Sequence, residues 1–145
     1  MGINAAPGDL SATHIFGIGF QYALSNHRFS QLTSLTPSPI GFTFNAGAEY
    51  FFGKKDIYDI TYKGYSFVHA FAGLILNSGL NGNISLTGGP SISIYTSSTL
   101  FGFGMNFNGN FYLSRNTGIS PAILLMKQQD INSICIASVR GSFSF

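Results

Sequence analysis

The chain has 145 residues, of which 45% are apolar and only 8% are Asp, Glu, Lys or Arg, and its formal net charge is +2. A typical soluble domain carries about 25% charged residues, so this composition argues against an ordinary water-exposed surface. The small net charge argues against nucleic-acid binding, and the single Cys135 excludes an intramolecular disulfide. No segment approaches the run of about 20 apolar residues that a transmembrane helix needs.

Apolar residues alternate with small or polar residues along the whole chain, and a period of two is the spacing of side chains on a β-strand. The clearest case is the segment 101–113, in which Phe103 and Phe107 fall on one face and Asn106 and Asn108 on the other. In chain order, the pattern predicts eight strands, at residues 14–24, 40–52, 57–63, 65–76, 84–96, 101–113, 118–127 and 132–145.

The register of the segment 65–76 is ambiguous, because this segment is apolar on both faces. We place Val68 and Leu74 on the outer face, which directs His69 into the barrel. Between the strands lie residues that favour turns, at 53–56, 77–82 and 114–117, and the longest connection is 25–39.

An even number of strands puts both termini on the same side, which is the periplasmic side in bacterial barrels. The connections 25–39, 96–98 and 128–131 are then expected to face outward, together with the region near Tyr65. The turns 53–56, 77–82 and 114–117 are expected to face the periplasm.

Side-chain volume predicts which face points outward. The interior of an eight-stranded barrel is just wide enough to be filled by side chains, so small residues belong inside and bulky ones outside. A soluble barrel has the opposite polarity, with many charged residues on the outer face of its strands. We therefore predict one domain, residues 1–145, folded as an all-β, eight-stranded, antiparallel, up-and-down transmembrane barrel. The expected lipid-facing residues include Phe16, Phe20, Phe42, Phe44, Phe101, Phe103, Phe107, Phe111, Phe143 and Phe145.

The alternating segment 138–145 closes the chain with aromatic residues at Phe143 and Phe145. This ending resembles the signal by which bacterial outer-membrane barrels are recognised for assembly. In size and strand count the chain resembles the small eight-stranded outer-membrane barrels of the OmpA and OmpX type, although it has no Trp. The resemblance implies a monomer in the bacterial outer membrane, whose partners are membrane lipids or lipopolysaccharide and the barrel-assembly machinery. Such proteins act as envelope anchors, adhesins, narrow pores or occasionally lipid-modifying enzymes.

Four charged residues fall on the predicted inner face, and charges in a narrow lumen must pair or contact water. Glu49 and Arg140 are expected at similar heights on strands that are two apart, so we predict an ion pair between them. Asp59 and Lys63 are expected to form a second group, bridged by water or a side chain because they lie about 13 Å apart along one strand. Such charges serve either as a structural plug or as the gate of a narrow water path.

These features favour an outer-membrane barrel with a structural or narrow-pore role and a small polar lumen. We expect no enzyme, because the three-residue spacing of Ser66 and His69 directs them to opposite faces, and we expect no cofactor and no metal site. Two alternatives stay open. One is a carrier or receptor for a small hydrophobic ligand that contacts His69 in the lumen. The other is a surface-binding protein that acts through the first outer loop, residues 25–39.

Overall fold

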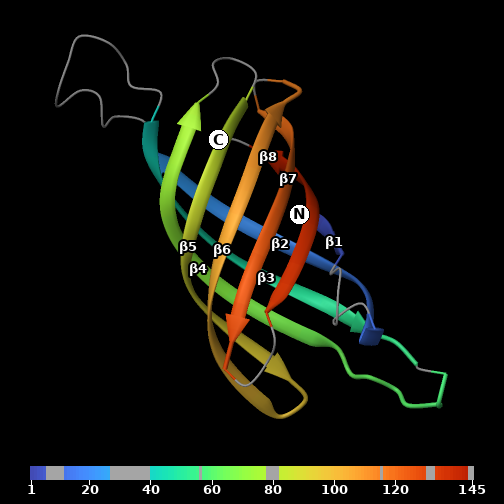
Figure 1. Ribbon diagram of the computed structural model, residues 1–145. Helices are drawn as coiled ribbons and strands as arrows, with labels where there is room; N and C mark the ends of the chain where they lie inside the picture. Colours follow the sequence, from blue (N-terminus) through green and yellow to red (C-terminus); the bar gives the residue numbers. More distant parts are fainter. Residues whose placement is uncertain are drawn as a thin grey trace, which may run out of the picture.

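The computed structural model describes residues 1–5, 12–26, 40–55, 57–77, 82–114, 116–129 and 133–143, which form a closed antiparallel barrel (Figure 1). Its strands are β1 (Gly2–Ala5), β2 (His14–Asn26), β3 (Ile40–Gly53), β4 (Tyr65–Asn77), β5 (Gly82–Tyr95), β6 (Ser98–Tyr112), β7 (Thr117–Gln128) and β8 (Ile134–Phe143). Each strand pairs with the next, and β1 pairs with β8 to close the wall. The described residues contain no helix that is long and apolar enough to cross a membrane.

The alternation sorts the side chains onto two different surfaces. On the outer surface Phe101, Phe103 and Phe107 are 62%, 58% and 51% exposed, whereas Thr87 and Asn106 are buried inside the barrel. The predicted all-β, eight-stranded antiparallel barrel is confirmed. Also on the outer surface are Phe16, Phe20, Phe42, Phe44, Phe111 and Phe143, while Phe145 lies outside the described residues.

The identity of the eight strands differs from the prediction at two places. The segment 57–63 is not a wall strand: it lies in the connection between β3 and β4, where Lys55 and Thr61 form an isolated antiparallel bridge and Asp59 has a φ of 62°. Its short alternation therefore belongs to a segment that folds back on itself. The missing strand is β1, which has only four residues, too few for a period of two to be recognised in the sequence.

Because β1 and not the segment 57–63 is a wall strand, different connections lie at the same end of the barrel. The strands β2, β4, β6 and β8 end at one end of the barrel, called here the terminal end, and β3, β5 and β7 end at the opposite, far end (Figure 1). The prediction that the connection 25–39 shares a side with 96–98 and 128–131 is wrong, as is the placement of 53–56 with 77–82 and 114–117. The physical reason is that the segment 57–63 does not cross the wall, so β4 follows β3 directly and the directions of β2 and β3 relative to the later strands are reversed. β1 restores the even number of strands.

An irregularity at the start of β2 changes the face on which its first residue lies. The pairing of β2 with β3 shifts in register between His14 and Gly17, and an extra residue in a strand moves the preceding side chain to the other face. His14 is therefore buried inside the far end, on the face opposite to Phe16 and Ile18. Its ring contacts the rings of Tyr65 and Tyr95 edge-on, at centroid distances of 6.1 and 6.2 Å.

Candidate functional site

The lumen is filled differently at its two ends, and the far half holds a packed apolar cluster together with the buried polar residues His14, Ser93 and Gln128. Buried side chains from β3, β4, β7 and β8 pack into one cluster, called here the apolar plug. Its members are Phe51, Tyr65, Phe67, Phe71, Leu124, Met126, Ile134 and Ile136. Within it, the rings of Phe51 and Phe67 stack at 6.4 Å, and Tyr65 donates a hydrogen bond of 2.9 Å to the Ser93 hydroxyl. Half of the plug consists of even-numbered residues of β7 and β8, and the other half of odd-numbered residues of β3 and β4; all of them point inward although they are apolar.

The predicted pair of Glu49 and Arg140 lies next to the plug, toward the terminal end. Arg140 Nη2 lies 2.9 Å from Glu49 Oε1, and the two side chains are 6% and 0% exposed. Arg140 Nη1 donates a further hydrogen bond of 2.5 Å to Gln21 Oε1, and the Asn4 amide donates to the second Glu49 oxygen. The guanidinium and the carboxylate therefore neutralise each other inside the barrel, and two amide side chains supply further hydrogen bonds. Arg140 Nε has no hydrogen-bond partner among the described residues.

Two glycines allow this ion pair to form. Glu49 and Arg140 lie on strands separated by both β1 and β2, in one row of paired residues that runs Glu49, Gly19, Gly2, Arg140. A Cβ at Gly19 would overlap the Glu49 carboxylate, and a Cβ at Gly2 would overlap the Arg140 side chain. The sequence predicts this pair with one intervening strand, whereas the structure has two, and each of them carries a glycine at this row. A glycine on the inner face of each intervening strand was the available signal.

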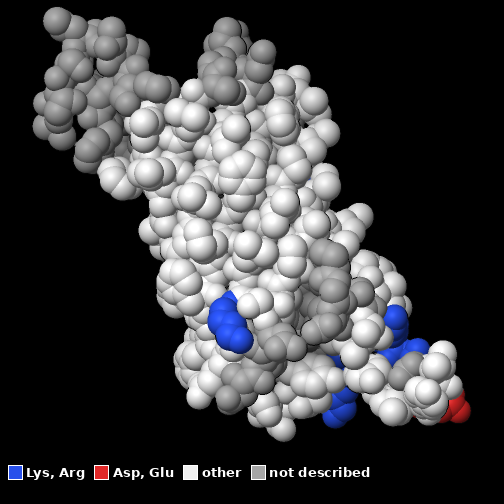
Figure 2. Space-filling view, in the orientation of Figure 1, with Lys and Arg blue, Asp and Glu red and all other residues white. Residues whose placement is uncertain are grey.

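The structure contradicts the second predicted lumen group. Asp59 and Lys63 lie in the connection between β3 and β4, outside the barrel, because the segment 57–63 is not a strand. Asp59 Oδ1 pairs instead with Lys55 Nζ at 2.7 Å, and these side chains are 86% and 60% exposed. Positive and negative charge lie together on the segment that projects from the far end (Figure 2). An exposed pair of this kind contributes little to stability and lines no lumen.

His69 points into the lumen and is buried against two members of the plug. Its ring packs on Phe71 at a centroid distance of 4.6 Å and on Phe67 at 6.0 Å. Gly47 pairs with His69 on the neighbouring strand, and its lack of a side chain leaves the space that the His69 ring occupies. Neither nitrogen of this ring has a hydrogen-bond partner among the described residues. Ser66 is on the opposite face of the strand, so the two do not form a nucleophile–base pair. The described residues also contain no cluster of three metal-ligating side chains.

The terminal half of the lumen is an open, polar cavity of about 650 Å³, called here the vestibule. Its wall carries a chain of amide hydrogen bonds that the sequence pattern does not predict. Asn110 donates to Asn83 Oδ1 at 2.8 Å, Asn83 donates to the Tyr112 hydroxyl at 2.6 Å, and Ser120 donates to Asn110. Arg140 lines the same cavity, so the ion pair lies where the vestibule ends and the filled part of the lumen begins.

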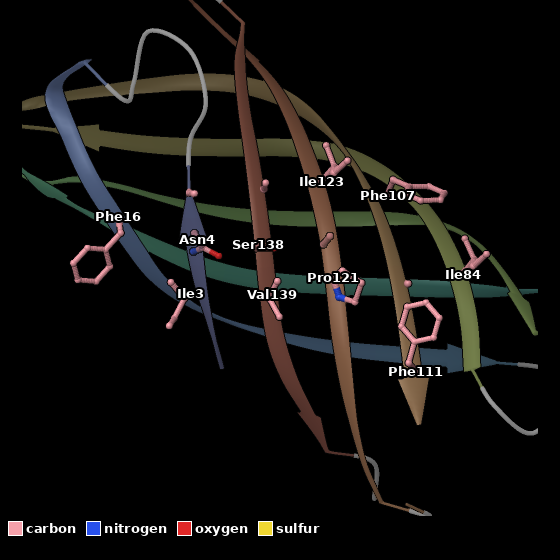
Figure 3. Close-up of a pocket in the computed structure, with 14 residues that line it drawn as sticks. Ile3, Asn4, Phe16, Ile84, Phe107, Phe111, Pro121, Ile123, Ser138 and Val139 are labelled. Atoms are coloured by element: carbon pink, nitrogen blue, oxygen red, sulfur yellow. The ribbon is translucent and has the colours of Figure 1, made fainter. Parts of the chain in front are cut away.

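The outer surface carries a second hollow, an apolar groove of about 740 Å³ that crosses β1, β7 and β8 (Figure 3). Ile3, Pro121 and Val139 line its middle, and Phe16 and Phe111 lie along its borders. Its lining is almost wholly apolar, and it lies on the surface that the phenylalanines cover. Its chemistry suits the acyl chains of a bilayer.

No family model and no curated protein matches this sequence. Among solved structures, the outer membrane protein Ail of Yersinia pestis, determined in a phospholipid bilayer nanodisc, is similar with a TM-score of 0.54 and 11% sequence identity. The alignment covers 99% of this chain and 97% of that chain. The fold is that of a small outer-membrane barrel. The resemblance to the OmpA and OmpX type is thereby confirmed, and the apolar outer surface suits the bacterial outer membrane in which barrels of this type lie.

Proposed function

We propose that this protein is a closed structural barrel of the bacterial outer membrane, held in lipid or lipopolysaccharide by its apolar outer surface, with both termini in the periplasm. The observation that carries the proposal is the apolar plug. Its members come from β3, β4, β7 and β8 and are almost completely buried inside the barrel, and Phe67 pairs directly with Glu49 of the ion pair. Among the described residues, the vestibule is an open cavity of the lumen and the plug is packed, and this arrangement supports a barrel without a continuous path for water.

Such a plug stops ions for a physical reason. An ion that enters the vestibule must pass the Glu49–Arg140 pair and then the buried rings of Phe67 and Phe71. An apolar constriction excludes the water that solvates an ion, and a bare ion in apolar surroundings is very unfavourable. The ion pair contributes stability at this level of the barrel, and the plug keeps the lumen closed.

Recordings in planar lipid bilayers test this proposal. Wild-type protein is expected to insert without unitary conductance, whereas the double variant Phe67→Ala, Phe71→Ala removes two rings from the plug and is expected to open a small one. The matched control is Phe101→Ala, Phe103→Ala, which removes two rings from the outer surface and is expected to remain closed. A steady conductance of the wild-type protein would refute the closed-barrel proposal.

The same recordings separate this role from that of a narrow pore. If the ion pair were a gate, Glu49→Ala and Arg140→Ala would each change the conductance of the wild-type protein. In a closed barrel both variants remain silent, because the plug is intact in each of them.

The two binding alternatives have weaker support. The connection 25–39 leaves β2 at the terminal end, which is periplasmic in this proposal, so it does not supply an outer binding surface. His69 packs directly against Phe71, which leaves no room at its ring face for a ligand.

A monomer, and recognition of β8 by the barrel-assembly machinery, complete the proposal. Size-exclusion chromatography with light scattering of the detergent-solubilised barrel measures the first, and cross-linking to that machinery during assembly measures the second.

A further inference from the structure

The connection between β3 and β4 projects from the far end of the barrel as a hairpin, called here the far hairpin (residues 54, 55 and 57–63). Figure 1 shows that it leaves the barrel sideways and continues the inclined direction of β3 and β4, whereas the connection between β5 and β6 turns back close to the strands that it joins. The same projection stands out from the body of the molecule in Figure 2. A segment that leaves the end of a membrane barrel sideways extends over the surface of the surrounding bilayer.

Hydrogen bonds at the rim of the barrel fix the base of the far hairpin. Lys54 N donates to Thr13 O, directly before β2, at 3.0 Å, and Tyr62 N donates to Lys54 O at 3.0 Å. His14 Nε2, on a ring that is buried inside the far end, donates to Lys63 O at 3.1 Å. Because the base is held to the wall on both of its chains, the sideways direction of the hairpin is part of the fold.

The tip of the far hairpin is apolar. The side chains of Ile57, Tyr58 and Ile60 are 87%, 76% and 53% exposed, a range that includes the lipid-facing Phe101 of the wall. The connection between β5 and β6, at the same end of the barrel, consists of residues 96–97, a threonine and a serine. Single apolar side chains on a surface are common, but three within four positions mark contact with an apolar or amphipathic partner.

The residues on both sides of the hairpin belong to the lipid-facing surface. Shortly before it, the ring of Phe52 contacts the rings of Tyr50 and Phe16, each at a centroid distance of 5.1 Å. Directly after it, Gly64 lies against the Tyr50 hydroxyl, which a Cβ at this position would overlap. The apolar tip is therefore continuous with a belt of aromatic rings at the end of the wall, and such belts lie at the level of the lipid headgroups.

The charged residues of the hairpin fit the same location. Asp59 is paired with Lys55 at 2.7 Å, so the carboxylate beside the apolar tip is neutralised. Lys54 and Lys63 lie at the base of the hairpin, next to the wall. A lysine at a membrane surface lays its apolar stem along the hydrocarbon and keeps its ammonium group among the headgroups.

We propose that the far hairpin anchors the barrel in the surface of the bilayer that surrounds it. Ile57, Tyr58 and Ile60 lie at the boundary between the lipid headgroups and the acyl chains, while the Lys55–Asp59 pair stays in water. The partner of the apolar tip is thus lipid, the same partner that covers the outer surface of the wall. This proposal rests on the membrane location of the barrel, and it is independent of whether the lumen is closed and of the side that the far end faces.

Depth-dependent fluorescence quenching in phosphatidylcholine nanodiscs tests the anchor. The chain contains no Trp, so Tyr58→Trp introduces a single fluorophore at the tip. Its emission is expected to be quenched by lipids brominated close to the headgroup and to be protected from iodide in the water. The matched control Ser97→Trp, in the polar connection at the same end, is expected to show the opposite behaviour. Met105→Trp, at the middle of β6, is expected to be quenched most by lipids brominated deep in the acyl chains.

The three variants distinguish failure of the anchor from failure of the membrane barrel. A Tyr58→Trp variant that behaves like Ser97→Trp would place the hairpin in water and overturn the proposal, whether or not the hairpin then binds a water-soluble partner. If Met105→Trp also escaped quenching by brominated lipid, the barrel itself would lie outside the bilayer, and the proposed function would fail together with the anchor.

Paramagnetic relaxation in nuclear magnetic resonance spectra gives a second measurement that needs no substitution. A nitroxide on the upper acyl chain of the lipid is expected to broaden the amide signals of residues 57–60 more than those of residues 96–97, and a gadolinium chelate in the water is expected to do the reverse. If the lipid label broadened residues 57–60 no more than residues 96–97, the hairpin would not enter the bilayer surface and the proposal would be overturned. Neither measurement depends on whether the lumen conducts ions, so this proposal and the closed barrel can fail separately.

Discussion

Replacing Arg140 with alanine tests how the buried charges are held in the lumen. In the variant, the Glu49 carboxylate keeps only the hydrogen bond from Asn4, and Gln21 loses its donor at 2.5 Å. Each buried polar group left without a partner costs about 1–3 kcal/mol, and breaking a buried ion pair costs about 3–5 kcal/mol in total. We therefore expect Arg140→Ala to lower the free energy of unfolding by about 3–5 kcal/mol.

The comparison with Glu49→Ala makes this prediction specific. If each single variant leaves an uncompensated charge, the double variant relieves both, and its loss of stability is smaller than the sum of the single losses by about 2 kcal/mol. The measurement is urea unfolding in phospholipid vesicles, followed by circular dichroism and by the gel mobility of unboiled samples. Additive losses, with a coupling near zero, would show that the two charges do not stabilise each other and would refute the reasoning.

Three further predictions concern the wall and its orientation. Gly19→Val is expected to prevent the buried ion pair and to unfold the barrel at lower urea concentration, whether or not Arg140 is present. Met105→Arg, at the middle of β6 on the outer surface, is expected to cost about 2–4 kcal/mol in the same assay, whereas Thr99→Arg near the strand end costs about 0–1 kcal/mol. In intact cells that produce Cys135→Ser protein, a membrane-impermeant maleimide is expected to label Thr61→Cys but not Ser114→Cys; the reverse pattern would place the termini outside.

The parts of the fold that could be predicted are those with a physical cause that acts in the same way on every strand. The pleat of a strand forces a period of two, and lipid outside a narrow lumen forces bulky residues onto one face, so Phe101, Phe103 and Phe107 were informative together. A period of two cannot be recognised in a segment of four residues, and for this reason the sequence does not predict β1. The segment 57–63 alternates for long enough to resemble a strand, but the sequence does not reveal that it folds back on itself.

The lumen was harder to predict because its contacts depend on strand order and register. The inward direction of Glu49 and Arg140 follows from their faces alone, but their distance depends on how many strands separate them and on what those strands carry. The face of β2 on which His14 lies depends on a register shift between β2 and β3, and no local pattern in the sequence indicates that shift. The amide chain through Asn83 and Asn110 was not foreseen, since a single polar residue on an inner face is expected in any barrel and says nothing about its neighbours.

The row of Glu49, Gly19, Gly2 and Arg140 links four positions that lie far apart in the chain. A side chain larger than hydrogen at either glycine occupies the volume that the charged groups need. Substitutions at these four positions are therefore not independent of one another. Homologous sequences that retain both charges are therefore expected to retain both glycines, and those that have lost the charges are free to carry alanine or serine there. Covariation across a homologue set would appear at these four alignment columns before it appeared at neighbouring wall positions.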